Sequence, residues 1–144
     1  MKAVHPYLNF PGNAEEAMEF YRSVFGGEFA SVMRFRDFGG DEMGVAEEEL
    51  DRIAHIGLAL SDGTFLMASD ATSSSPKKLS TGNRVYITLE PDDANEARRL
   101  FDGLSAGGEV EMPLQRTVWA ELYGSFVDRF GIQWMVNYEG EVSI

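Results

Sequence analysis

Residues 13–17 read NAEEA, and residues 93–97 read DANEA, 80 positions further along the chain. The apolar positions that follow keep this offset, with Ala17, Phe20, Tyr21 and Val24 answered by Ala97, Leu100, Phe101 and Leu104. Paired glycines then close both segments, at 26–27 and at 107–108. The chain therefore carries one structural plan twice, which predicts a pseudo-twofold arrangement with a binding cleft near its axis.

Each repeated segment is predicted to form an amphipathic helix, because its apolar positions follow the i, i+3, i+4, i+7 spacing of one helix face. Asn13 with Glu16, and Asp93 with Glu96, have the spacing of a capping box. In that motif the first side chain accepts a hydrogen bond from the start of the helix. The paired glycines can adopt the left-handed conformation that ends a helix.

Alternating apolar residues predict one strand before each helix and three strands after it. We expect the opening strands at 4–10 and 85–89. The later strands are expected at 28–36, 53–60 and 64–69 in the first copy, and at 109–114, 120–127 and 132–138 in the second. Each copy is then a βαβββ module, at about 3–70 and 83–140. A polar linker at 71–82 joins them and is expected to be exposed and mobile, and residues 1–144 are expected to form one α+β domain.

Composition narrows the class of protein. The 144 residues contain 44% hydrophobic side chains, enough for a packed core, and no apolar run of about 18 residues that would cross a membrane. The absence of cysteine and of an apolar leader is compatible with a cytoplasmic protein. A net charge of −12 argues against nucleic-acid and anionic-membrane partners. The acidic run at 47–49, with Asp51, is expected to be a solvated loop or short helix.

Short motifs run along nearly the whole chain: PYLNF at 6–10 with GN at 12–13, FY at 20–21, FGG at 25–27, AH at 54–55, LM at 66–67 with SD at 69–70, MPLQ at 112–115 with Trp119, and DRFG at 128–131 followed by Trp134. With the duplicated βαβββ plan, this set resembles the PhnB-like branch of the vicinal oxygen chelate superfamily, which includes glyoxalase I, bleomycin resistance proteins and dioxygenases. The resemblance implies two modules whose strands form a curved, incomplete barrel around a pocket, commonly in a homodimer. Function within that superfamily is diverse.

The resemblance also implies where a metal would bind, since metal-dependent relatives take His from the opening strands and Glu from the closing ones. Side-chain alternation carries those positions onto His5, Arg84, Met67 and Met135. A catalytic divalent ion needs about three nitrogen or oxygen ligands, and only His5 supplies one. We therefore predict no metal or other cofactor, and interpret the two methionines as flexible parts of a pocket wall. A divalent site, or Cu(I) on His5 and the two thioethers, is the alternative.

His55 is the candidate catalytic residue, because strand alternation places it in the cavity beside Gly57 and Ala59, with Ile56 on the helix side. An imidazole there could act as general acid or base, since its ordinary pKa of about 6.5 lies near working pH. It could instead contact a ligand, or hydrogen-bond a neighbouring strand or Asp70 and only shape the pocket.

The other inward-facing candidates are mainly amides, phenols and hydroxyls, which suit a small molecule with several hydrogen-bonding groups: Tyr7, Asn9, Tyr86, Thr88, Gln133 and Asn137. Arg84 could bind a carboxylate or phosphate of that molecule, or form a surface salt bridge. Trp119 could cap the pocket, or lie in the core or a dimer interface. Trp134 is expected in the core, and Asp128 is interpreted as a turn residue.

The leading hypothesis is a cytoplasmic, homodimeric, PhnB-like protein that binds a small organic molecule in a metal-free pocket. Whether it also catalyses a reaction is left open by the sequence. The alternatives are a metal-dependent enzyme of the glyoxalase or dioxygenase type and a fold used for protein assembly. No P-loop, no glycine-rich dinucleotide turn and no Gly-x-Ser-x-Gly motif occurs. The absence of a glycine-rich strand–helix turn also argues against a nucleotide-type methyl donor.

Overall fold

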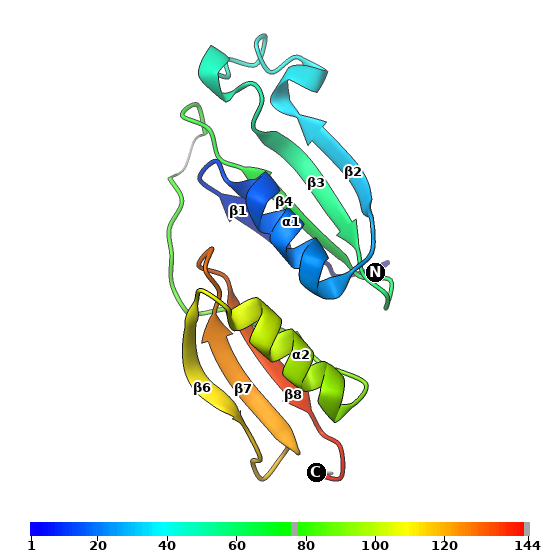
Figure 1. The fold of residues 1–144 in the computed structure, drawn as a ribbon. Helices are drawn as coiled ribbons and strands as arrows, with labels where there is room; N and C mark the ends of the chain where they lie inside the picture. The colour runs from blue at the N-terminus through cyan, green and yellow to red at the C-terminus, as the bar shows by residue number, and fades with distance from the viewer. Residues whose placement is uncertain (76–77, 143–144) are drawn as a thin grey trace. The chain divides into compact units, whose positions relative to one another are not determined.

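The computed structural model describes residues 1–75 and 78–142, and the chain forms two compact units, Met1–Ser80 and Thr81–Ile144. Each unit holds a four-stranded sheet with one helix across one of its faces (Figure 1). The predicted α+β class and the duplicated βαβββ plan are therefore confirmed, and neither sheet closes on itself. The predicted linker includes Pro76 and Lys77, which lie outside the described residues.

The first unit consists of β1 (Tyr7–Phe10), α1 (Ala14–Phe25), β2 (Phe29–Arg34), β3 (Ile53–Ala59) and β4 (Phe65–Asp70). The strand order is β1-β4-β3-β2, with β1 parallel to β4 and the other pairs antiparallel. The connection between β2 and β3 carries two 3₁₀ helices, η1 (Phe35–Phe38) and η2 (Glu47–Glu49). This connection is the main addition to the βαβββ plan.

The second unit repeats the order with β5 (Ile87–Leu89), α2 (Ala94–Ser105), β6 (Glu109–Gln115), β7 (Leu122–Val127) and β8 (Gln133–Tyr138). Its sheet runs β5-β8-β7-β6, and β5 is parallel to β8. No helix among the described residues is both long and apolar enough to span a bilayer.

Both opening strands are shorter than predicted. Pro6 has no N–H to donate to a ladder, so β1 begins only at Tyr7, although the Pro6 carbonyl still accepts a hydrogen bond from the Met67 N–H. In the second unit, Val85 begins the strand predicted at 85–89, but it is 74% exposed and lies outside β5. The alternation of apolar residues therefore overestimated the length over which these strands pair with a neighbouring strand.

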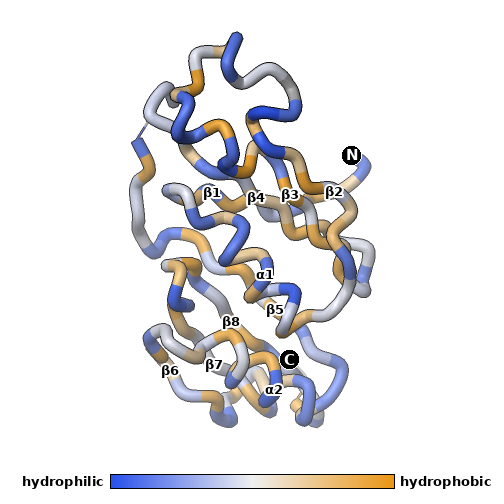
Figure 2. The backbone as a smooth tube through the Cα atoms, turned by 45° about the horizontal axis from the view of Figure 1, so that its top comes forward, coloured by the Kyte–Doolittle hydropathy of each residue, from blue (hydrophilic) through white to orange (hydrophobic). Residues whose placement is uncertain are grey.

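The predicted apolar stripe is buried along its whole length in α2 but only in part in α1, where Phe20 and Val24 are half-buried. Ala17, Met18 and Tyr21 of α1 are fully buried, as are Ala97 and Leu104 of α2. Figure 2 shows hydrophobic and hydrophilic residues alternating along the helices and strands, as expected for elements with one buried face. Trp134 is buried, which confirms its predicted place in the core.

The two helices are capped differently, and one predicted capping box is wrong. Asp93 has an extended backbone and accepts a hydrogen bond from the Glu96 N–H at 2.7 Å, as predicted. Asn13 makes no side-chain capping bond, because its backbone (φ −114°, ψ 27°) departs from the extended cap conformation. Asp70 caps α1 instead: its Oδ1 accepts from the Ala14 N–H and its Oδ2 from the Ile53 N–H, both at 2.9 Å.

The acidic run at 47–49 forms the short helix η2, which was one of the two predicted conformations. Glu49, however, is not exposed to solvent. Its side chain is buried and accepts hydrogen bonds from both the N–H and the hydroxyl of Ser73, and it forms a 3.0 Å ion pair with Arg52. Arg52 in turn donates to the Ala71 carbonyl. Glu49 therefore ties the β2–β3 connection to the segment that follows β4.

We predict that this contact stabilises the fold in a pH-dependent way. The hydrogen bonds from Ser73, followed by the charge of Arg52, lower the pKa of Glu49 below its ordinary value of about 4.3. A carboxyl with a lowered folded-state pKa contributes stability above its unfolded pKa and loses it as the pH falls through the folded value. The gap in free energy of unfolding between the wild type and Glu49→Gln should therefore be constant above about pH 5 and shrink below about pH 4.

Urea unfolding at a series of pH values measures that gap, and Glu48→Gln, which removes an exposed carboxylate next to Glu49, is the matched control. The control should show no comparable gap at any pH. A gap for Glu49→Gln that stayed constant down to pH 3 would contradict the role of the ionised carboxylate.

Candidate functional site

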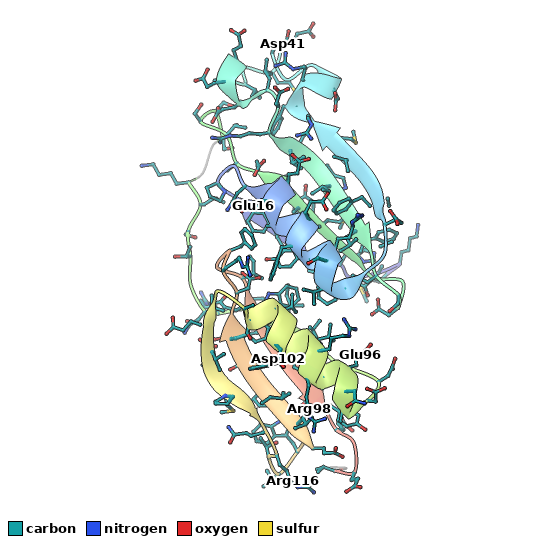
Figure 3. All side chains as sticks on the ribbon, in the orientation of Figure 1. Glu16, Asp41, Glu96, Arg98, Asp102 and Arg116 are labelled. Atoms are coloured by element: carbon teal, nitrogen blue, oxygen red, sulfur yellow. The ribbon has the colours of Figure 1, made fainter. Side chains whose placement is uncertain are left out.

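The face of the first sheet opposite α1, here called the first helix-free face, carries no acidic side chain, Lys or Arg. Its members alternate with buried residues such as Ile56 and Leu66, and neighbouring strands pair them in register: Tyr7, Asn9, Ser31, Met33, His55, Gly57, Ala59, Phe65, Met67 and Ser69. Charged residues make up 25% of the chain, so ten positions on an open face would be expected to include about two or three. The outer face of α2, by contrast, projects Arg98 and Asp102 into solvent (Figure 3).

Gly57, near the middle of this face, is buried beneath side chains of neighbouring residues. A Cβ placed on Gly57 would lie 3.5 Å from Ser31 Oγ, 3.7 Å from His55 Nε2 and 3.8 Å from Met67 Cγ. One hydroxyl, one imidazole nitrogen and one thioether side chain thus converge on a point that has no side chain of its own. We call this point, with the three side chains around it, the Gly57 niche.

Tyr7 orients the imidazole of His55. The Tyr7 hydroxyl lies 3.3 Å from His55 Nδ1, and the two rings are 5.8 Å apart. If Nδ1–H donates to Tyr7, Nε2 is an acceptor or base at the niche; if Tyr7 donates, Nε2 carries the proton there. His55 therefore hydrogen-bonds across the sheet to β1, whereas the Asp70 carboxylate is engaged by the backbone of Ala14 and Ile53.

His5 lies at the other end of the same sheet from His55. The Phe65 N–H donates to His5 Nδ1 at 3.0 Å, and the two rings form an edge-to-face contact at 5.5 Å. Phe65 is paired with Ala59, which is four residues from His55 along β3, or about 13 Å at strand spacing. One metal ion therefore cannot bind both imidazoles through this face.

The face of the second sheet opposite α2, the second helix-free face, is centred on Met135. The Tyr123 hydroxyl donates to Met135 Sδ at 3.3 Å and the Thr88 hydroxyl does so at 3.9 Å. Met135 Sδ thus accepts hydrogen bonds from two hydroxyl groups, which restrict the side chain more than apolar packing alone would.

Two further contacts extend this face. Tyr86 donates its hydroxyl to both carboxylate oxygens of Glu111, at 2.7 and 2.9 Å, and Trp119 packs edge-to-face on Tyr123 with ring centroids 5.2 Å apart. The hydrogen bond to Glu111 raises the pKa of Tyr86, with further contributions from burial, the Glu111 charge and Tyr123. Trp119 is 38% exposed, so it does not lie in the core of the unit.

Sheet register corrects the sequence equivalence between the two opening strands. Tyr7 pairs with Met67 and Thr88 pairs with Met135, so the residue equivalent to His5 is Tyr86 and not Arg84. The hydroxyl of Tyr86 is engaged by Glu111, and the two closing-strand positions hold thioethers. This donor set does not fit a divalent ion, which prefers several oxygen or nitrogen ligands. Throughout residues 1–75 and 78–142, no three His, Cys, Asp or Glu side chains form a group that could hold a metal.

The remaining predicted residues are distributed over both faces. Asn9 accepts a hydrogen bond from Ser69 at 3.5 Å, and Gln133 donates its amide to the Gly82 carbonyl. Asn137 is half-buried on β8, and Arg84 is exposed just before β5. The role of Arg84 in binding an anion stays a prediction.

Asp128 is a turn residue, as predicted, but its side chain does more than form the turn. Its Oδ1 accepts from the backbone N–H groups of Phe130 and Ile132, and its Oδ2 accepts from the indole of Trp134 at 2.8 Å. The carboxylate is buried and belongs to the framework of the second unit.

Sequence reasoning missed Ser31, Tyr123 and Glu111, and it treated Gly57 only as room around His55. Two irregularities in β2 and two in β6 shift the registers of those strands, and simple alternation cannot locate such shifts. Tyr123 could have been found, because it stands 68 residues after His55, the offset that relates Met67 to Met135.

Comparisons with known proteins agree with this architecture. Residues 4–136 match the Glyoxalase/Bleomycin resistance protein/Dioxygenase superfamily. Protein YjdN of Escherichia coli (strain K12) is 32% identical over 139 residues, 92% of each chain. Among solved structures, protein PA1353 of Pseudomonas aeruginosa is 39% identical with a TM-score of 0.83, covering 96% of this chain and 98% of that one. The PhnB protein of Bacillus cereus is 25% identical with a TM-score of 0.70, covering 95% and 99%. The chain therefore belongs to the glyoxalase/bleomycin resistance protein/dioxygenase superfamily and is PhnB-like within it.

Proposed function

We propose that this protein binds a small organic molecule on the first helix-free face, without a metal ion, as a cytoplasmic homodimer. The observation that carries the proposal is the Gly57 niche, where Ser31, His55 and Met67 converge on the position that a Cβ of Gly57 would take. Small-molecule sites typically combine apolar walls with a few placed polar groups, and the niche has both.

The surroundings of the niche support a ligand rather than bulk water. Tyr7, Met33 and Phe65 are large side chains, each about two-fifths exposed, on a face that has no charged group. Exposed apolar and aromatic surface of this kind is typical of a ligand or interaction site. The ligand class that this surface fits is a compact, uncharged or weakly polar molecule with an aromatic or apolar part and one or two hydrogen-bonding groups.

The decisive variant is Gly57→Ala. The added methyl group would make ordinary van der Waals contacts with its three neighbours, so the fold should be retained while the niche is filled. Chelator-treated protein is screened by ligand-observed NMR against a library of small aromatic and hydroxylated compounds. Compounds that bind the wild type should lose at least about tenfold in affinity in Gly57→Ala, since a filled site cannot accept the same group.

Two controls complete the test. Gly82→Ala, which adds the same methyl group at an open position in the second unit, should leave affinity unchanged. Zn, Ni, Mn, Co and Fe(II) should give no saturable thermal shift, whereas an ion at 100 times its dissociation constant would add about 2.7 kcal/mol. A shift with one ion that disappears in His5→Ala, or binding that Gly57→Ala leaves intact, would overturn the proposal.

One contact favours a catalytic role for His55 as a second candidate function. The Tyr7 hydroxyl holds His55 Nδ1, which leaves Nε2 directed at the niche, an arrangement that suits a general acid or base. If a bound compound is turned over, His55→Ala should abolish turnover while Tyr7→Phe, which removes the orienting hydroxyl, should reduce it. Loss of binding alone in both variants would assign His55 to recognition.

A further inference from the structure

The second helix-free face gathers three aromatic rings and one carboxylate, which we call the aromatic–carboxylate cluster: Tyr86, Glu111, Trp119 and Tyr123. Trp119 packs on Tyr123, and the hydroxyl of Tyr86 is bound by Glu111. Tyr123 also lies near enough to Tyr86 to contribute to the raised pKa of its hydroxyl. Tyr123 pairs with Gln115 on β6, and Glu111 lies four residues before it, so the cluster spans on the order of 10 Å.

The carboxylate of Glu111 has capacity for another partner. It is exposed, and no salt bridge from the described residues reaches it. The Tyr86 hydroxyl, shared between the two oxygens, occupies at most two of about four acceptor positions on the carboxylate. A negative charge therefore stands beside aromatic side chains whose ring faces are also electronegative.

These features select one class of ligand. Aromatic faces next to a carboxylate attract a cation, and the net charge of −12 favours its approach. Magnesium and calcium ions need about six or more oxygen ligands, which one carboxylate and two phenols do not supply. An alkylammonium ion needs no such set of oxygen ligands, because aromatic ring faces and a single carboxylate can bind it.

We propose that the aromatic–carboxylate cluster binds a small organic ammonium ion, with Trp119 and Tyr123 contacting its alkyl groups and Glu111 balancing its charge. The site lies wholly within the second unit, so this inference goes beyond the function proposed for the first helix-free face. It does not depend on the Gly57 niche, and the two proposals can fail separately.

Choline and its uncharged isostere 3,3-dimethylbutan-1-ol form the test pair, measured by isothermal titration at constant ionic strength. Choline should bind, and the isostere should bind about tenfold more weakly or not at all, because it has the same shape without the charge. Glu111→Gln should weaken choline binding by about two- to fivefold, which is the scale of one exposed ion pair. Trp119→Ala should abolish measurable binding.

Two control variants test whether the effects are specific to this cluster. Glu48→Gln removes the same charge from an exposed position in the first unit, so it should leave choline affinity unchanged. Gly57→Ala should also leave it unchanged, which separates this site from the first helix-free face. The proposal is overturned if choline does not bind, if the isostere binds as tightly as choline, or if Glu48→Gln and Glu111→Gln have equal effects.

Discussion

Replacing Asp128 with alanine is expected to lower the free energy of unfolding by about 4 kcal/mol, because three donors lose a charged acceptor. The backbone N–H groups of Phe130 and Ile132 and the indole N–H of Trp134 all donate to this one carboxylate. Asp128 and Trp134 are almost fully buried, so water cannot replace the lost acceptor without opening the β7–β8 turn.

Urea unfolding followed by circular dichroism measures this effect, and a second substitution separates its parts. Asp128→Asn keeps an acceptor for the two backbone groups but can turn an NH₂ toward the indole, so about half the loss is expected. In the double variant with Trp134→Phe the opposing indole donor is gone, and the loss should be smaller than the sum of the single losses. Asp102→Ala removes an exposed carboxylate on α2 (Figure 3) and should change stability by less than about 0.5 kcal/mol. A loss below about 1 kcal/mol for Asp128→Ala would contradict the framework role.

Gly124→Ala is expected to destabilise the second unit by about 3 kcal/mol through overpacking. A Cβ on Gly124 would lie 2.6 Å from Phe101 Cε2, 2.9 Å from the Met112 carbonyl oxygen and 3.1 Å from Leu114 Cα. Two of these atoms belong to the backbone of β6, so they cannot move aside as a flexible side chain could. The helix and the neighbouring strand must therefore separate to accommodate a single methyl group.

Gly57→Ala is the matched control for this variant, since both glycines lie in the third strand of their modules. The closest contact of a Cβ on Gly57 would be 3.5 Å, an ordinary packing distance, and stability should change by less than about 0.5 kcal/mol. Thermal melts of the two variants side by side make the comparison. Equal losses for Gly57→Ala and Gly124→Ala would show that the cost arises from strand propensity and not from the contact with Phe101.

Comparison of the two modules explains why the close contact of Gly124 with Phe101 could not be predicted from the sequence. At the positions equivalent to Phe101 and Gly124, the first unit has Tyr21 and Ile56, both buried. The same contact between helix and third strand is thus made with a large strand residue in one unit and with none in the other. Complementary volumes of this kind depend on the distance between helix and sheet, which periodicity does not encode.

In the candidate site, too, some relations between residues could be predicted from the sequence and others could not. Alternation placed Tyr7, Asn9 and His55 together on one face, and the registers of β1, β3 and β4 agree with that placement. Alternation could not show that His5 and His55 lie at opposite ends of the sheet, or that Glu111 reaches Tyr86. Those relations depend on register shifts and on side-chain reach across strands.

The sequence by itself determined the duplicated βαβββ plan, the two amphipathic helices and the family, because each depends on local spacing or on motifs. Only the tertiary structure decided which polar groups pair over long distances in the chain: Asp70 and not Asn13 caps α1, and Glu49 is buried against Ser73. A buried carboxylate must find donors wherever the fold brings them. Those donors lie 17 to 56 residues away along the chain, beyond the range over which a sequence pattern specifies a contact.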